Sequence, residues 1–152
     1  MLFRSGMTIA GQAELAGIPA QIDAAMDFRA GGPRQVLQRV VVQSRATTAQ
    51  LAQNGFDLAP IAEGTIGLAA TLTEHRDGNG ELALGADLAD ATLSVAQLGW
   101  HKPTGSSARA AARLVLSHDR LTAIDDLALE GDRKSTRLNS SHEIPSRMPS
   151  SA

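Results

Sequence analysis

The chain has 152 residues, a formal net charge of −2 and no cysteine, so it is about the size of one domain. Without cysteine it has no disulfide, no thiolate nucleophile and no cysteine-based metal site. The near-neutral charge and the 3% aromatic content, with no tyrosine, argue against nucleic-acid binding, and no apolar run reaches the ~18 residues of a membrane-spanning helix.

Apolar and polar residues alternate with a period of two along most of the chain, which predicts half-buried β-strands. Glycine, proline and asparagine stand between the alternating runs and predict hairpin turns, the strongest at residues 77–80 (DGNG). About eight short strands follow from this pattern. In chain order they are expected over 7–15, 22–28, 36–44, 65–72, 82–88, 93–98, 110–116 and 121–130.

One short helix is expected near residues 48–54. Thr47 or Thr48 can cap its start, and Gly55 can end it. The fold class is therefore mainly β, with antiparallel hairpins that form a curled, open, groove-like sheet. Leu, Ile, Val and Ala supply the apolar faces, and the few aromatic side chains favour an open sheet over a closed sandwich.

Residues 132–152 differ from the rest of the chain in composition and charge. Residues 1–131 hold 10 basic and 14 acidic side chains, whereas 132–152 hold 4 and 2. The string DRKSTRLNSSH resembles one reading frame of a common short-read sequencing adapter, and the residues after it fit an index and the adapter remainder. We therefore expect 1–131 to be a fragment of a longer β-groove domain and 132–152 to be a non-native, disordered tail.

No catalytic constellation stands out, so we expect a protein that is not an enzyme and that uses no cofactor. The histidines outside the tail, His75, His101 and His118, lack the i, i+2 or i, i+4 spacing of metal ligands, and no metal site is expected. Asp125 and Asp126 are adjacent in a predicted strand, where neighbouring side chains point to opposite faces. They therefore do not form an acid–base pair.

Residues 98–105 (LGWHKPTG) hold the single tryptophan between two apolar strands. Together with residues 51–60 (LAQNGFDLAP) and 87–93 (DLADATL), this order resembles the AsmA-like proteins of Gram-negative bacteria, in particular the YhdP-like branch. The resemblance covers most of residues 6–131, and His101 stands where the family more often has arginine. Its most specific positions are Leu98, Gly99, Trp100, Lys102, Pro103 and Gly105.

The resemblance implies a segment of a long periplasmic protein that is anchored in the inner membrane by a helix outside this fragment. Such proteins are implicated in carrying phospholipid between the inner and outer membranes along an apolar β-groove. The implied partners are phospholipid acyl chains, the rest of the parent chain and, through the anchor, the envelope membranes, with no nucleic acid. The residues expected to line the groove are Ile66, Leu68, Leu72, Leu82, Leu84, Leu88, Leu93, Val95, Leu114 and Leu116.

Two other functions remain open at this point. A similar groove could be a scaffold for outer-membrane protein assembly that offers an edge strand to a client by β-augmentation. A compact β-sandwich binding module would instead bury its apolar faces against each other. Variants at the sheet edge, rather than in the groove, would disable the scaffold.

Overall fold

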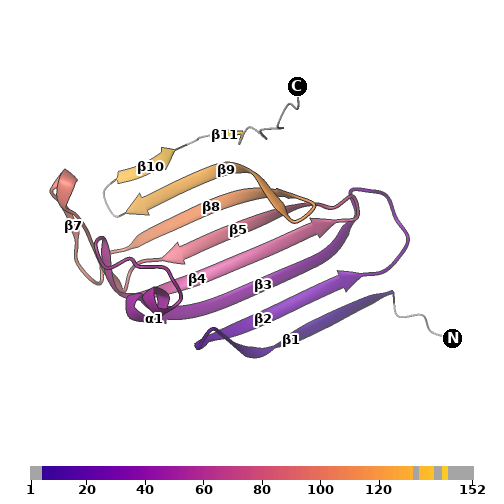
Figure 1. Ribbon diagram of the computed structural model, residues 1–152, viewed down its shortest axis with the longest axis horizontal. Coiled ribbons are helices and arrows are strands. Elements are labelled where there is room, and N and C mark those ends of the chain that lie inside the picture. Colours follow the sequence, from indigo (N-terminus) through magenta and orange to yellow (C-terminus); the bar gives the residue numbers. More distant parts are fainter. Residues whose placement is uncertain (1–4, 132–133, 139–141, 144–152) are drawn as a thin grey trace, which may run out of the picture.

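The structure is an open antiparallel sheet with a short helix on one face (Figure 1). The computed structural model describes residues 5–131, 134–138 and 142–143. Its elements are β1 (Gly6–Leu15), β2 (Ile18–Asp27), β3 (Val36–Thr47), α1 (Thr48–Gln53), β4 (Ala62–His75), β5 (Asn79–Asp87), β6 (Ala91–Val95), the 3₁₀ turn η1 (Ala96–Leu98), β7 (Trp100–Lys102), β8 (Ala108–Ser117), β9 (Arg120–Gly131), β10 (Lys134–Leu138) and β11 (His142–Glu143).

Among the residues that the structure describes, the main sheet has nine strands in a simple meander. Its order is β1-β2-β3-β4-β5-β8-β9, and both β10 and β11 pair with β9. The two remaining strands, β6 and β7, branch from the start of β4 as a small second sheet. The predicted class is confirmed: the protein is mainly β, its sheet is open and antiparallel, and one short helix lies near 48–54.

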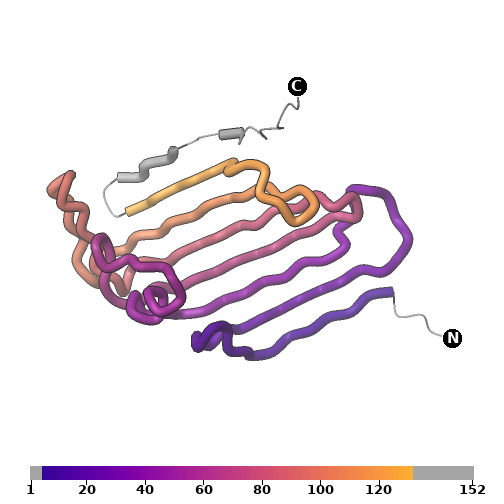
Figure 2. Tube along the Cα trace, in the orientation of Figure 1, coloured from indigo at the N-terminus to yellow at the C-terminus, as the bar shows by residue number. Residues whose placement is uncertain are grey.

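The sheet is not strongly curled (Figure 2). Sheets bend sharply at β-bulges and glycine kinks. Register shifts occur in the β3–β4 and β8–β9 ladders, whereas the central β4–β5 and β5–β8 ladders run without a shift. The middle of the sheet therefore bends less than the curled groove predicted from the sequence.

Two hairpins use two-residue turns in which both residues have positive φ. These are Ala16 and Gly17 between β1 and β2, with φ of 51° and 79°, and His118 and Asp119 between β8 and β9, with φ of 50° and 62°. Turns of this kind match the right-handed twist of the strands they join. They fix the register of the outer hairpins.

The region 91–102 differs from the prediction of one continuing strand. It forms two short strands, β6 and β7, on either side of the 3₁₀ turn η1. Gly99 ends this turn in the left-handed conformation, with φ of 59°. Leu98 lies in the turn and is 78% exposed, so it does not continue the apolar pattern of the sheet.

The register of the main sheet places the apolar residues of successive strands side by side. Val42 lies opposite Ile22 on one side and Ala70 on the other, and Leu84 lies opposite Ala70 and Ala112. Directly opposed residues point to the same face of a sheet. One face is therefore apolar from β1 to β9, and the other carries most of the charged side chains.

The helix α1 covers one end of this apolar face. Thr47 begins the helix with a capping box: its side chain accepts from the Gln50 N–H at 3.2 Å, and the Gln50 side chain accepts from the Thr47 N–H at 2.9 Å. Leu51 is the buried residue of the helix. It belongs to a core cluster formed with Ile18, Ala46, Ala62, Ile66, Leu88, Ala91, Leu93 and Ala108.

Gly64 allows the start of β4 to pass close to the loop after β5. Its φ is +127°, and a Cβ at this position would lie 2.6 Å from the backbone oxygen of Asp90. The next residue, Thr65, donates its N–H to that same oxygen at 3.3 Å, and Ala91 is fully buried beside it. Only glycine adopts this conformation at this separation without displacing the loop.

We predict that Gly64→Ala lowers the free energy of unfolding by about 2 kcal/mol or more, because it adds both a steric overlap and backbone strain. The control is Gly11→Ala in β1, where a Cβ would meet nothing within 4 Å. Urea unfolding of the two variants should show a large loss for Gly64→Ala and a small change for Gly11→Ala. Equal midpoints would contradict this account of Gly64.

The segment 132–152, expected to be a non-native tail, contributes the short strands β10 and β11. Lys134 pairs with Gly131, and Leu138 pairs with Leu127, both across the outer edge of β9. Strand pairing uses backbone groups that every residue except proline possesses, so it is compatible with any origin of the sequence. The other residues of the segment lie outside the described part of the chain, and the adapter origin stays a prediction.

Candidate functional site

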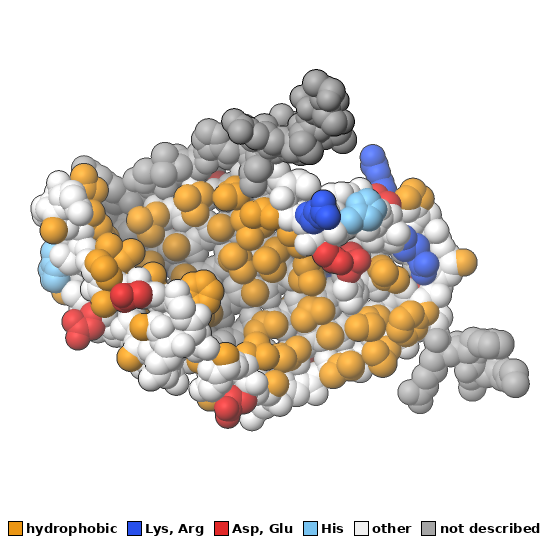
Figure 3. All heavy atoms as spheres, in the orientation of Figure 1, with side chains coloured by type: hydrophobic (Ala, Val, Ile, Leu, Met, Phe, Trp, Pro, Cys, Tyr) orange, Lys and Arg blue, Asp and Glu red, His pale blue; other side chains and the backbone are white. Residues whose placement is uncertain are grey.

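Beyond α1, the described elements leave the apolar face of the sheet uncovered. Figure 3 shows hydrophobic side chains over the strands on the face that carries α1. Several large ones are exposed by two fifths or more, including Ile9 (51%), Leu15 (47%) and Leu127 (45%). A soluble monomer rarely exposes so wide an apolar area, and such areas mark binding surfaces.

A groove of about 480 Å³ runs across this face. This volume is within the usual range for a small-molecule site, and the lining is almost wholly apolar. The side chains that line it come from β1, β2, β3, β4, β5, β8 and β9. They include Leu15, Ile18, Val42, Leu68, Ala70, Leu84, Ala86, Ala110, Ala112 and Leu127.

Most of the predicted lining residues lie on this face, but not all are open to a ligand. Ile66, Leu88 and Leu93 are buried in the core cluster at the covered end. Val95 lies on β6, outside the main sheet. The remaining six share the uncovered part of the face: Leu68, Leu72, Leu82, Leu84, Leu114 and Leu116.

The apolar face extends further than the prediction, which drew its lining residues from the middle of the chain. Strands β1, β2, β3 and β9 add nine further apolar side chains to it. Period-two alternation marks these residues as well, but only the pairing register aligns them with the rest. The added residues are Met7, Ile9, Leu15, Ile22, Met26, Val40, Val42, Leu127 and Leu129.

Polar side chains on this face are few. Near the end away from α1, the Gln38 side-chain amide donates to the Glu74 carboxylate, so the two polar groups satisfy each other. Ser44 lies between Ala20 and Leu68, and its buried hydroxyl has no hydrogen-bond partner among the described residues. The rest of the strip between these positions is apolar.

The opposite face has a different character. A shallow hollow of about 1200 Å³ lies over it, because Gly67, Ala69, Gly85 and Ala111 leave the middle of the sheet without large side chains. Charges of both signs surround the hollow. Its rim includes Glu14, Arg45, Asp87, Arg109, Asp126 and Glu130. This mixture of charges favours contact with water over an apolar ligand.

Lys102 shows what the LGWHKPTG segment does in the fold. It is only 5% exposed, and its ammonium donates to the backbone oxygens of Ala91 (2.8 Å), Pro103 (3.1 Å) and Ala89 (3.5 Å). The Gly105 N–H also donates to the Ala89 oxygen, at 2.8 Å. The segment therefore ties down the loop after β5. Trp100, the residue that draws attention in the sequence, is 41% exposed.

We predict that Lys102→Met lowers the free energy of unfolding by about 1–3 kcal/mol, because the buried loop carbonyls lose their donor. Met preserves most of the apolar length of the side chain. His101→Met, at an exposed neighbouring position, is the control and should change stability little. Urea midpoints measure both, and a Lys102→Met variant as stable as the parent chain would show that the ammonium is not needed.

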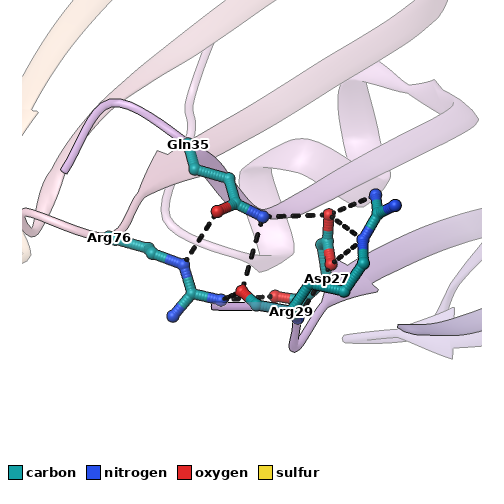
Figure 4. A network of polar contacts seen from close by, with 4 residues as sticks. All are labelled: Asp27, Arg29, Gln35 and Arg76. Atoms are coloured by element: carbon teal, nitrogen blue, oxygen red, sulfur yellow. Dashed lines mark hydrogen bonds and ion pairs between the residues drawn. The ribbon is translucent and has the colours of Figure 1, made fainter. Parts of the chain in front are cut away.

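A polar network anchors the long β2–β3 loop at the end of the sheet away from α1 (Figure 4). Arg29 forms an ion pair with Asp27 at 2.8 Å, and the Gln35 amide donates to the same carboxylate at 3.1 Å. Arg76, in the β4–β5 turn, donates to the Gln35 side-chain oxygen at 3.3 Å and to the backbone oxygen of Arg29. Hydrogen bonds from Arg29 hold the pKa of the Asp27 carboxyl well below its usual value.

This network predicts a pH-dependent contribution to stability. Because the pKa of Asp27 is lower in the folded than in the unfolded chain, its contribution is complete above the unfolded value of 3.8 and is lost as the pH falls toward the native one. The urea midpoint of the parent chain should therefore fall more steeply from about pH 5 to about pH 2 than that of Asp27→Asn. Arg29→Met should flatten the profile in the same way, and an unchanged slope in both variants would contradict the assignment.

Within the part of the chain that the structure describes, no three His, Asp or Glu side chains come together as a potential metal site. The described residues also include no helix with the length and apolar character needed to cross a bilayer. His75 and His118 lie at hairpin turns, where each contacts a neighbouring polar group, Asn79 and Ser117 respectively.

Comparison with known proteins adds no relative: no family model, curated protein or solved structure matches the chain. The resemblance to AsmA-like proteins therefore stays a prediction based on the residues quoted for it. The apolar face is defined by the strand register and the side-chain exposure of this chain alone.

Proposed function

We propose that the apolar face binds the acyl chains of phospholipids, and that the chain is a non-enzymatic segment of a periplasmic protein that carries lipid between the inner and outer membranes. The observation that supports the proposal is the apolar strip, aligned from β1 to β9 and left uncovered beyond α1. The residues we assign to it are Leu68, Leu72, Leu82, Leu84, Leu114 and Leu116.

A strip of this kind suits acyl chains because they need no directional contact. Each methylene group that leaves water contributes ~0.8 kcal/mol, wherever it lies along the strip. Side chains of similar polarity on successive strands let a chain move sideways without crossing a charged residue. The partners, the membrane anchor and the periplasmic location belong to the same proposal and rest on the resemblance described above.

Photocrosslinking tests the proposal. A benzophenone amino acid at Leu84, which is 39% exposed on the apolar face, should form phospholipid adducts when the chain is mixed with phosphatidylethanolamine–phosphatidylglycerol vesicles. The matched control is Ala83, which lies next to it in β5 and opposite Arg113 on the other face. Mass spectrometry should find lipid at position 84 in at least about tenfold excess over position 83.

Equal lipid labelling at both positions, or none at either, would overturn the proposal. Protein adducts at position 84 without lipid would instead indicate that a second protein layer covers this face. Such a layer would favour the sandwich module, which the described residues do not supply by themselves.

The scaffold alternative has one specific observation in its favour. Strand β1 is exposed along its whole length, and no described residue pairs with its outer edge, where an extended segment of a client protein could add. Substitutions that block this edge, rather than substitutions on the apolar face, would disable such a function.

A further inference from the structure

The apolar face changes in polarity along the direction of its strands. At the end beside α1, Leu51 and Ile66 belong to the buried core cluster. At the far end, Gln38 and Glu74 lie on the face itself, and the polar network around Asp27 lies at the same end of the sheet (Figure 4). An amphiphile aligned with the strands therefore meets apolar surroundings at one end and polar surroundings at the other.

The strip between these ends is long enough for an acyl chain. Leu68 and Glu74 lie on the same face of β4, and a strand rises ~3.4 Å per residue, so about 20 Å separate them. The hydrocarbon core of a bilayer is ~30 Å thick, which leaves about 15 Å for each layer of acyl chains. A lipid tail that starts beside Glu74 therefore reaches the residues next to the covered end.

The groove of about 480 Å³ lies where such a tail would end. Its lining includes Leu68, Ala86 and Ala110, which are opposed in register and pack against the core cluster. The small side chains of Ala86 and Ala110 leave this part of the face hollow, whereas the larger Leu72 and Leu82 lie opposite each other nearer the far end. Methylene groups in the hollow contact its walls as well as its floor, which adds to the apolar area removed from water.

Glu74 brings a negative charge to the far end of the strip. It is half-buried, and one of its carboxylate oxygens accepts from the Gln38 amide. Among the described residues, no cationic side chain forms an ion pair with it. A carboxylate offers about four acceptor positions, so this group retains the capacity to accept further hydrogen bonds. An ammonium group would supply both the donors and the opposite charge.

We propose that a bound phospholipid lies along the strands, with its acyl chains toward α1 and an ammonium-bearing head group beside Glu74. This inference rests on the proposed lipid binding and adds the direction of the lipid and the class of its head group. The reverse direction would place a polar head group against the apolar surface around Leu68, where it would lose hydration without compensation. An anionic head group would meet the Glu74 carboxylate with a charge of the same sign.

Nitroxide quenching tests the direction of the lipid. The chain has no cysteine, so Ala110→Cys and Leu116→Cys each accept one bimane label, about 20 Å apart on the same face of β8. The complete labelled chain is mixed with vesicles of phosphatidylethanolamine and a phosphatidylcholine whose acyl chain carries a nitroxide near either its carboxyl or its methyl end. Flotation then removes the vesicles, so that only lipid carried by the chain quenches the label.

Position 116 should lose at least about twofold more fluorescence to the nitroxide near the carboxyl end, and position 110 to the nitroxide near the methyl end. The same order at both positions would overturn the proposed direction and leave lipid binding intact. No quenching at either position would overturn the proposed lipid binding, and this inference with it.

The lipid that the complete chain carries from vesicles with equal amounts of phosphatidylethanolamine and phosphatidylglycerol tests the head-group assignment. An exposed ion pair changes a ratio of affinities by up to about fivefold, so mass spectrometry should find the ethanolamine lipid enriched by about two- to fivefold. Glu74→Gln keeps an acceptor for the Gln38 amide but removes the charge, and it should bring the ratio close to that of the vesicles.

The matched control is Glu81→Gln, which removes the same charge from the opposite face, where Glu81 pairs with Arg113. This variant should keep the parental enrichment. Equal amounts of the two lipids on the parent chain, unchanged enrichment in Glu74→Gln, or an equal loss in both variants would overturn the role of Glu74. A parent chain that carries no lipid would instead refute the proposed function itself.

Discussion

The structure depends on one constraint: in an antiparallel sheet, residues that lie opposite each other share a face. Alternating sequences in registers such as Val42 with Ala70 and Ala70 with Leu84 bring most of the large apolar side chains to the same side. A shift of one residue in any ladder would break this surface. The regular central ladders therefore create both the stability of the sheet and its apolar face.

The apolar face is closed at one end. There, α1, the loop after β5 and the branch formed by β6 and β7 bury a small cluster that includes Ile66 and Leu51. Gly64 permits the close approach of β4 to that loop. The Lys102 ammonium donates hydrogen bonds to inward-facing backbone carbonyl groups of the same loop. Most of the buried apolar side chains lie at this end, so much of the hydrophobic stabilisation of the described residues comes from it. The network around Asp27 plays the corresponding role for the loop at the other end.

Beyond this closed end, the described part of the sheet is a single layer. Its apolar face and the outer edge of β1 have no contact with another described element, and the two surfaces suit different partners. The face between α1 and the far turns lacks apolar contacts, which acyl chains could supply without directional bonds. No described residue pairs with the outer edge of β1, whose backbone groups could accept another extended strand. Occupation of one surface does not block the other.

The sequence alone predicted the hairpins, the short helix and the open antiparallel class, because alternation and turn residues are local signals that strand geometry obeys. It also predicted the facing of central residues such as Leu84. Only the tertiary structure decided which apolar residues remain open. Ile66 and Leu84 follow the same alternation, yet Ile66 lies under α1 and Leu84 does not. Lys102, rather than Trp100, is buried because a loop folds back over it. The alternation of apolar and polar residues is a local signal and does not predict such a long-range contact.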